Sequence, residues 1–426
     1  MRPSRFRRPL CACLQAAVLC LDGALLAGPY SAGLNDPGSA TDAPIPGFVG
    51  PDGQGMARID DGFGIINDRN YVNPLFFDWA NAVTSYAPAP GVAGAWANSS
   101  FTLGAVSGDH FDVASLGDLA SGGTPGQLTL HFANPIRDLS GADFTVFENA
   151  FFQGTGAASL FAEFAYVEVS ADGVNFARFP GRSLTAAAVG QYGSIDPTDV
   201  FNLAGKHVNA FGASWGTPFD LADVGLVSVS YVRFVDIPGN GTSLDSLNQP
   251  IYDASVTIGS GGADIEAVGA ISRLMTFPAW PGLSALAVAD RGPGADPDGD
   301  GVSNLLEYAF ARLPHLPDAA ASPVQVESHA DRLEIIFSRD ERATDLTYDV
   351  QVRDNLGAGS WTTIARSVAG QPVAPVASFT PTITETSASA ITSVRVIRKV
   401  RVADVQTMAG HGSRFLRVLV TQTTVP

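Results

Sequence analysis

The 426-residue chain is long enough for two or three domains, and its composition, 46% hydrophobic and 16% charged, can supply their cores. A formal net charge of −17 argues against nucleic-acid binding, which needs basic surface, and disfavours anionic membranes. Calcium, by contrast, is a natural partner of acidic surface.

The first 33 residues have the parts of a secretory signal peptide. Arginines at positions 2, 5, 7 and 8 precede an apolar run over residues 10–21, and Ser31-Ala32-Gly33 offers small residues for cleavage after Gly33. We therefore expect a secreted or cell-surface protein, with no membrane-spanning run in the mature chain. All three cysteines lie in this segment, so the mature chain would contain neither disulfides nor thiolate sites.

Residues 34–272 form the first predicted domain. Residues 34–70 have no period, whereas residues 76–86 have helical spacing and predict a short helix. Alternating apolar residues then predict strands over residues 127–132, 143–147, 164–170, 176–179, 227–237 and 263–271. The Ala171-Asp172-Gly173 turn predicts a hairpin between the third and fourth of these. Short strands with Gly-rich connections favour an all-β, jelly-roll-like sandwich.

Two sets of side chains in this domain are candidates for binding. Trp215, Trp96 and Phe152 would suit stacking on a sugar ring if they lie on loops; the alternative is that they are core aromatics. Acidic residues provide a possible second metal site, and the alternative is that they face solvent or accept hydrogen bonds in turns. They are Asp143, Glu148, Asp236, Asp264 and Glu266.

Several segments of this domain resemble a family of uncharacterised bacterial cell-surface proteins. The likeness is carried by residues 113–118, 141–149, 165–176, 204–207, 217–221 and 262–269. Many members end in a PEP-CTERM sorting segment, which this sequence lacks, so covalent sorting is not expected. The hairpin and last strand are also similar to galactose-binding-like jelly rolls, which include carbohydrate-binding modules. The resemblance implies a glycan ligand and brings no catalytic residues with it.

Residues 273–318 form a predicted linker that contains the strongest motif of the sequence. Twelve residues from 296 to 307 match the EF-hand calcium loop at all five specified positions. The expected ligands are carboxylates at loop positions 1, 3, 5 and 12, a backbone carbonyl at position 7 and an amide at position 9. These residues are Asp296, Asp298, Asp300, Val302, Asn304 and Glu307. The alternative is a solvated acidic turn before a helix.

A helix is predicted over residues 303–313, and Pro314 ends it. No helix can precede the loop, because Arg291-Gly-Pro-Gly-Ala295 cannot be helical. The loop therefore resembles the single-helix calcium motifs of dockerins and thrombospondin type 3 repeats. That resemblance implies a structural joint between domains. It does not imply a calcium sensor.

Residues 319–426 form the last predicted domain, a small β-sandwich of about the usual size. Its predicted strands cover residues 332–337, 347–352, 361–365, 393–402 and 415–420.

The sequence favours a protein that is not an enzyme. Gly212-Ala-Ser214-Trp-Gly216 matches a nucleophile elbow in its letters only, because no strand–turn–helix context surrounds it. We expect a secreted calcium-binding protein of the cell surface that acts in binding or adhesion, with a glycan as ligand. A polysaccharide-active hydrolase and a structural component of the envelope or matrix are the alternatives.

Overall fold

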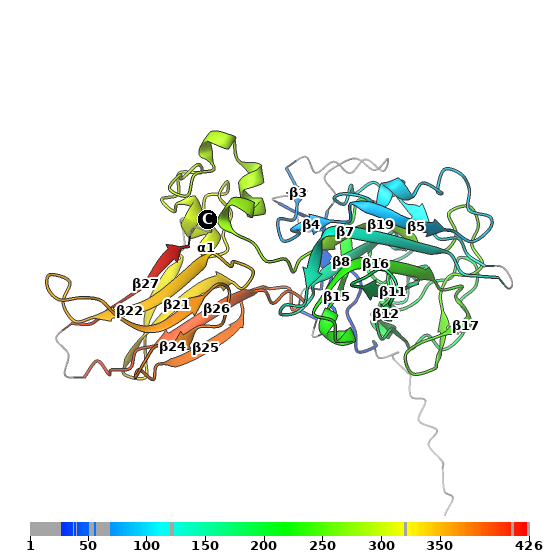
Figure 1. Cartoon of the computed structure of the whole chain (residues 1–426). Coiled ribbons are helices and arrows are strands. Elements are labelled where there is room, and N and C mark those ends of the chain that lie inside the picture. The colour runs from blue at the N-terminus through cyan, green and yellow to red at the C-terminus, as the bar shows by residue number, and fades with distance from the viewer. Residues whose placement is uncertain are drawn as a thin grey trace, which may run out of the picture.

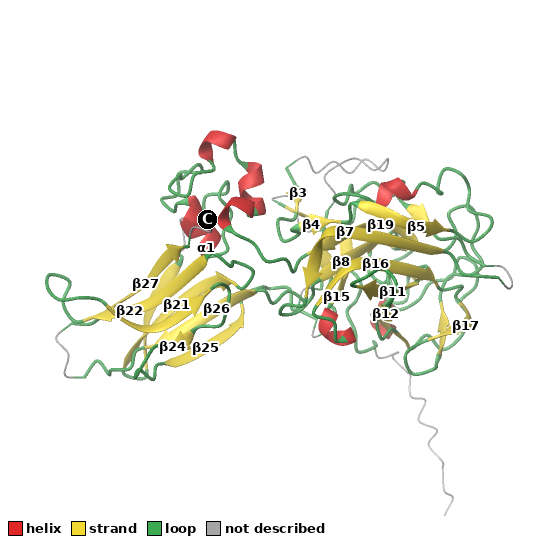
Figure 2. Cartoon of the chain, viewed as in Figure 1, coloured by secondary structure: helices red, strands yellow, loops and turns green. Residues whose placement is uncertain are grey.

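The computed structural model describes residues 27–36, 38–39, 41–50, 55–56, 69–119, 123–318, 322–409 and 413–423. Most of the predicted signal peptide, residues 1–26, lies outside these ranges. Strands dominate the described chain, and its helical segments are short (Figure 2). None of the described helices combines the length and the apolar character that crossing a membrane would take.

Two antiparallel sheets form the body of the first domain, the blue to green lobe of Figure 1. One has the order β1 (Ile45–Pro46), β15 (Trp215–Phe219), β8 (Phe144–Glu148), β19 (Asp264–Ala270) and β4 (Asp78–Trp79), with β6 (Ala114–Ser115) also paired to β19. The other has the order β12 (Ala177–Arg178), β11 (Ala165–Ser170), β16 (Ser228–Asp236), β7 (Gln127–Arg137) and β5 (Ala82–Ala87).

Alternation along these strands places the core between the two sheets. On β7, Leu128, Leu130 and Phe132 are completely buried, and they share one hydrophobic cluster with Phe144 and Val146 of β8. The prediction of a mainly β, antiparallel architecture is therefore confirmed. The hairpin is confirmed too, because β11 pairs with β12 in antiparallel register.

Short ribbons and 3-10 turns complete the first domain. The ribbons pair β2 (Phe48–Val49) with β3 (Tyr71–Val72), β9 (Phe151–Phe152) with β10 (Leu160–Phe161), β13 (Arg182–Ser183) with β14 (Val200–Phe201), and β17 (Asn240–Leu244) with β18 (Pro250–Tyr252). The 3-10 turns are η1 (Ser99–Thr102), η2 (Pro197–Asp199) and η3 (Leu221–Val224).

The predicted helix over residues 76–86 is wrong, since β4 and β5 occupy this region. A short apolar run fits the period of a helix and also that of a strand. Here the segment forms a strand, because β5 pairs with β7. Thr84 donates its hydroxyl to the carbonyl of Thr129 on β7, which helps to fix β5 at the edge of the sheet.

The second sandwich consists of two four-stranded antiparallel sheets, the yellow to red lobe of Figure 1. One has the order β20 (Val324–His329), β21 (Arg332–Asp340), β26 (Ile397–Ala403) and β25 (Thr382–Ser387). The other has the order β24 (Ala374–Pro375), β23 (Thr362–Val368), β22 (Leu346–Arg353) and β27 (Phe415–Gln422).

The segment predicted as a linker packs against this second sandwich. It contains η4 (Phe277–Ala279), η5 (Pro281–Ala285), η6 (Val288–Asp290) and α1 (Asn304–Ala309), which lie beside the second lobe in Figure 1. Tyr308 is 1% exposed and shares one hydrophobic cluster with Phe337 and Val350 of the two sheets. Its hydroxyl also donates to Asp345 at 2.9 Å. The acidic loop is thus attached to the core of one domain, because its helix supplies part of that core.

The two sandwiches also touch directly. Arg342 of the second is 5% exposed, pairs with Asp340, and donates to the carbonyls of Leu75 and Ile271 in the first at 3.1 and 3.0 Å. Nearby, the backbone N–H of Ala142 donates to the carbonyl of Ser393 at 2.8 Å. Val394 and Val396 join a hydrophobic cluster of the first domain. These contacts fix the domains to each other without using the acidic loop.

Residues 28–33, predicted to be removed with the signal, pack on the first domain. Ser31 is 1% exposed, and its hydroxyl is 2.7 Å from Nε2 of the buried His207. Its backbone N–H donates to Asp42, which also forms a buried ion pair with Lys206. These contacts make the segment part of the folded domain.

Candidate functional site

The acidic loop brings three carboxylates together. Oxygens of Asp296, Asp298 and Asp300 lie within 4.8 Å of one another, so this triad could hold a metal ion. Asp296 accepts the backbone N–H groups of Gly299 and Gly301, both at 3.0 Å. Gly301 has φ +91°, a conformation that favours glycine, so this residue allows the chain to turn around the carboxylates.

Glu307 extends this group from helix α1. It is completely buried, and neither carboxylate oxygen has a hydrogen-bond partner among the described residues. Burial, followed by the charges of Asp298 and Asp300, raises the pKa of Glu307 to about 8. A buried carboxylate with no donor is costly, and hard cations bind such oxygens. Glu307 therefore fits the role of a metal ligand.

Asn304 and Val302 connect the loop to its surroundings. Asn304 is completely buried, and its side-chain amide donates to the carbonyls of Asp290 and Gly292 at 2.7 and 2.9 Å. Its Oδ1 has no partner among the described residues and stays available as a ligand. Val302 donates its backbone N–H to Asp300, which keeps the loop curved towards the triad.

The sequence motif does not include a fifth acid, which lies beside the triad and Glu307. Asp318 donates its backbone N–H to Asp300 at 3.2 Å, and its carboxylate accepts from Arg312 at 2.7 Å. It follows Pro317, beyond the twelve-residue motif, so the motif gave no reason to include it. The negative charge of Asp318 also contributes to raising the pKa of Glu307.

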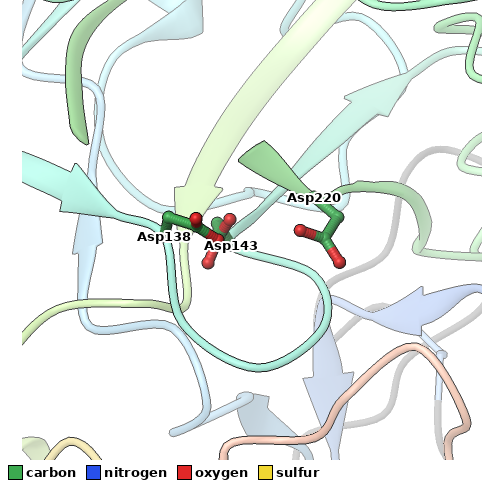
Figure 3. Close-up of side chains that lie close together, drawn as sticks. All are labelled: Asp138, Asp143 and Asp220. Carbon is green, nitrogen blue, oxygen red and sulfur yellow. The ribbon is translucent and has the colours of Figure 1, made fainter. Parts of the chain in front are cut away.

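A second triad lies in the first domain, where oxygens of Asp138, Asp143 and Asp220 are within 4.8 Å of one another (Figure 3). Both oxygens of Asp143 already accept backbone N–H groups, from Leu139 at 2.9 Å and Leu221 at 2.7 Å. Burial raises its pKa to about 8. These hydrogen bonds connect the segment at Leu139 to the segment at Leu221 through Asp143. Asp143 therefore has a structural role that needs no ion.

Other acids of the first domain surround a cavity of about 230 Å³, which we call the acidic pocket. Glu148, Glu163 and Asp264 line it, at 3%, 8% and 5% exposure. Phe151, Phe161 and Tyr192 also line it, together with Asn149, Ala150, Gln153, Thr257, Ile258 and Ser260. The pocket combines several carboxylates with aromatic rings, and no described lysine or arginine lines it.

Glu148 and Asp264 are among the acids predicted from the sequence as a second metal site, and Glu163 is not. Asp264 and Glu266 are two residues apart, a spacing that places side chains on one face of a regular strand. The pairing of β19 with β8 shifts register between Ile265 and Ala267, and Glu266 instead accepts the backbone N–H of Ser107 at 2.7 Å, outside the pocket lining. A local irregularity of this kind leaves no sequence signal.

The three aromatic residues predicted to stack on a glycan are separated by the fold. Trp215 is 3% exposed on β15, so its ring belongs to the interior and offers no free face. Trp96 is half-buried and stacks on Phe111, with ring centroids 5.8 Å apart. Phe152 is half-buried beside a different cavity, of about 460 Å³, which Leu34 and Pro197 also line. These three aromatic residues do not form one platform.

Ser214, the serine of the formal match to a nucleophile elbow, is completely buried.

No protein-family model matches this chain, and a search of curated proteins gives no match. The residues of the acidic loop and of the acidic pocket are therefore the basis for the function proposed below.

Proposed function

We propose that this is a secreted, calcium-binding protein of the cell surface that acts by binding, with a glycan as its ligand. In this proposal Asp296, Asp298 and Asp300 hold one calcium ion together with Glu307. Asn304 contributes Oδ1 directly or through water, and Val302 contributes its carbonyl. The ion supplies positive charge and up to eight coordination positions for oxygen.

The observation that carries the proposal is the state of Glu307. Its carboxylate is buried beside three aspartates, and no described residue donates a hydrogen bond to it. An ordinary acidic turn would leave this side chain in solvent or would pair it with a cation of the protein. A divalent ion at the triad would satisfy its oxygens and offset the repulsion among the four carboxylates.

Calcium in this loop would act mainly on the second sandwich. Helix α1 begins within the twelve-residue loop, and Tyr308 and Ala309 of that helix lie in the core of the second sandwich. Fixing the loop would therefore hold the helix against the sheets and stabilise this domain.

Calorimetric titration of the purified protein with calcium tests the proposal. We expect one site with a dissociation constant on the order of 0.1–1 mM, as in extracellular modules with a single loop. Glu307→Gln and Asp300→Ala should abolish the signal, because each removes a charged ligand. Glu327→Gln, an exposed change in the same domain, is the matched control. Unchanged heat in the two loop variants would contradict the proposed site.

The acidic pocket favours a polysaccharide hydrolase as the second candidate. Glycoside hydrolysis needs a carboxyl group kept protonated near neutral pH, and burial raises the pKa of Glu148 to about 8. Release of reducing ends from polysaccharides, lost in Glu163→Gln, would support this candidate. Binding without release would support the non-catalytic proposal.

A further inference from the structure

The acidic pocket is built from segments far apart in the chain. Glu148 ends β8, Asp264 begins β19, and Glu163 lies just before β11. Backbone groups hold these side chains in place: Glu148 accepts from the N–H of Asp264 and from that of Ala150, both at 3.0 Å. The carboxyl groups are therefore fixed by the ends of packed strands before any ligand arrives.

Unused acceptors remain in the lining of this pocket. Glu163 accepts from Thr257 and from the N–H of Gly262 through Oε1, whereas Oε2 has no hydrogen-bond partner among the described residues. Asn149 also lines the pocket, and its buried Oδ1 has no partner in the part of the chain that the structure describes. Asp264 uses Oδ1 to accept from Ser115. Fixed acceptors without donors indicate a ligand that brings donors.

The charge around the pocket indicates that this ligand is a cation. Burial first, and then the neighbouring acids, raise the pKa of Glu163 and of Asp264 well above the usual values for carboxyl groups. Among the described residues, no lysine or arginine lines the cavity to offset them. A positively charged ligand would relieve this repulsion, whereas a neutral one would leave it in place.

The spacing of the acids distinguishes an organic cation from a metal ion. Among the described residues, the two aspartate triads are the acid groups whose oxygens converge within 4.8 Å, and the acids of this pocket do not form such a group. They surround about 230 Å³, less than a pocket for a drug-sized molecule and enough for one ring-sized ligand.

The aromatic residues indicate the shape of that cation. Phe151 and Phe161 stack with ring centroids 5.0 Å apart, and Tyr192 is 61% exposed. Aromatic faces bind the C–H faces of sugar rings and also attract ammonium groups.

We propose that the acidic pocket binds one amino-sugar unit of a glycan, with its ammonium group between Glu163 and Asp264 and its ring beside Phe151, Phe161 and Tyr192. This inference rests on the proposed glycan binding and specifies its ligand class. The free amine donates to Oε2 of Glu163 and shares the carboxylate of Asp264 with Ser115 and Ser260, and its positive charge offsets the negative charge of the acids.

Calorimetric titration of the full chain, in buffer that keeps the calcium loop saturated, tests the proposal with three probes. Glucosamine carries the ring and the charge, N-acetylglucosamine carries the ring with a neutral amide, and glucose carries the ring alone. We expect glucosamine to bind more tightly than the other two by a factor on the order of ten or more. Equal binding of all three would overturn the cationic ligand.

Variants locate the binding. Glu163→Gln keeps the shape of the side chain and removes its charge, so glucosamine binding should weaken by a factor on the order of ten. Tyr192→Ala, at the exposed rim, should weaken it about threefold to tenfold without unfolding the domain. Glu327→Gln, in the other domain, should leave it unchanged. Glucosamine binding that survives both pocket variants would place the ligand elsewhere and overturn the proposal.

A final arm separates this inference from the calcium proposal. Calcium titrated into the Glu307→Gln protein reports on every site other than the acidic loop, and we expect no heat. Calcium binding there that Glu163→Gln abolishes would make the pocket a metal site and would overturn the amino-sugar assignment. Binding of a neutral glycan unaffected by Glu163→Gln would leave the proposed function intact and reject this pocket as its site.

Discussion

At the scale of single residues, burial separates the functional candidates from the structural ones. Trp215 and Glu307 are both buried. An apolar ring gains from burial by removing its surface from water, so Trp215 needs no further explanation. A carboxylate without donors loses solvation, so Glu307 requires a partner.

Trp215→Ala should therefore act on stability. Removing a large buried aromatic leaves a cavity, and we expect the first domain to lose about 3–5 kcal/mol of unfolding free energy. The half-buried Trp96→Ala should cost about 1 kcal/mol or less. Denaturant unfolding followed by fluorescence checks both. A Trp215→Ala protein of unchanged stability would show that the ring lies outside the core.

At the scale of elements, the sequence predicts those that local pattern determines. The hairpin of β11 and β12 and the helix α1 were predicted, because alternation and the acidic motif are local signals. Strands β20 and β25 were not, since their side chains are mostly exposed or half-buried and give no hydrophobic period. The acidic pocket was found only in part, because its acids meet through pairing of distant strands.

The amino-terminal segment leads to a prediction about processing. Besides the contacts of Ser31, the backbone N–H of Gly28 donates to Thr198 at 2.7 Å, and Gly33 accepts from Val208 at 2.9 Å. Cleavage after Gly33 would remove these contacts, at a cost on the order of 3 kcal/mol. Cleavage after Ala27 would keep them, and Ala27 is a small residue suited to the −1 position.

We therefore expect the exported protein to begin at Gly28. Expression with its own leader in a Gram-negative host, followed by amino-terminal sequencing, checks this. The Ser31→Ala protein should start at the same residue but unfold more easily, because it lacks the hydrogen bond to His207. A chain that starts at Leu34 would contradict the prediction, and one that retains residues 1–26 would contradict cleavage of the signal.

At the scale of the whole molecule, the sequence predicts the acidic loop as the joint between the domains, and the structure adds direct contacts between them. A Gly- and Pro-rich segment that contains a calcium motif looks like a hinge. Its apolar residues, however, pack into the second sandwich, and the domains meet through Arg342 and the segment around Val394. These residues are distant in sequence from the motif, so no local pattern could assign them to the interface.

This arrangement separates two effects that a calcium hinge would combine. Removing calcium with a chelator should leave the angle between the sandwiches unchanged and destabilise only the second. With a dissociation constant of 0.1–1 mM, 10 mM calcium stabilises that domain by about 1.4–2.7 kcal/mol, and chelation removes this amount. Arg342→Ala should instead loosen the contact between the sandwiches and leave calcium binding unchanged. It removes the ion-pair partner of Asp340 and the donor to two carbonyls at the interface, and it keeps the calcium ligands.

Small-angle scattering and calorimetric melting together check both expectations. The radius of gyration should be the same with calcium and with chelator, while the melting transition of the second sandwich shifts. In the Arg342→Ala protein the radius of gyration should increase, and calcium should still bind. A radius that responds to calcium while the second sandwich stays folded, and that is unchanged in Arg342→Ala, would assign the acidic loop the role of an interdomain joint, because an ion that stabilises only the second sandwich would leave the radius unchanged.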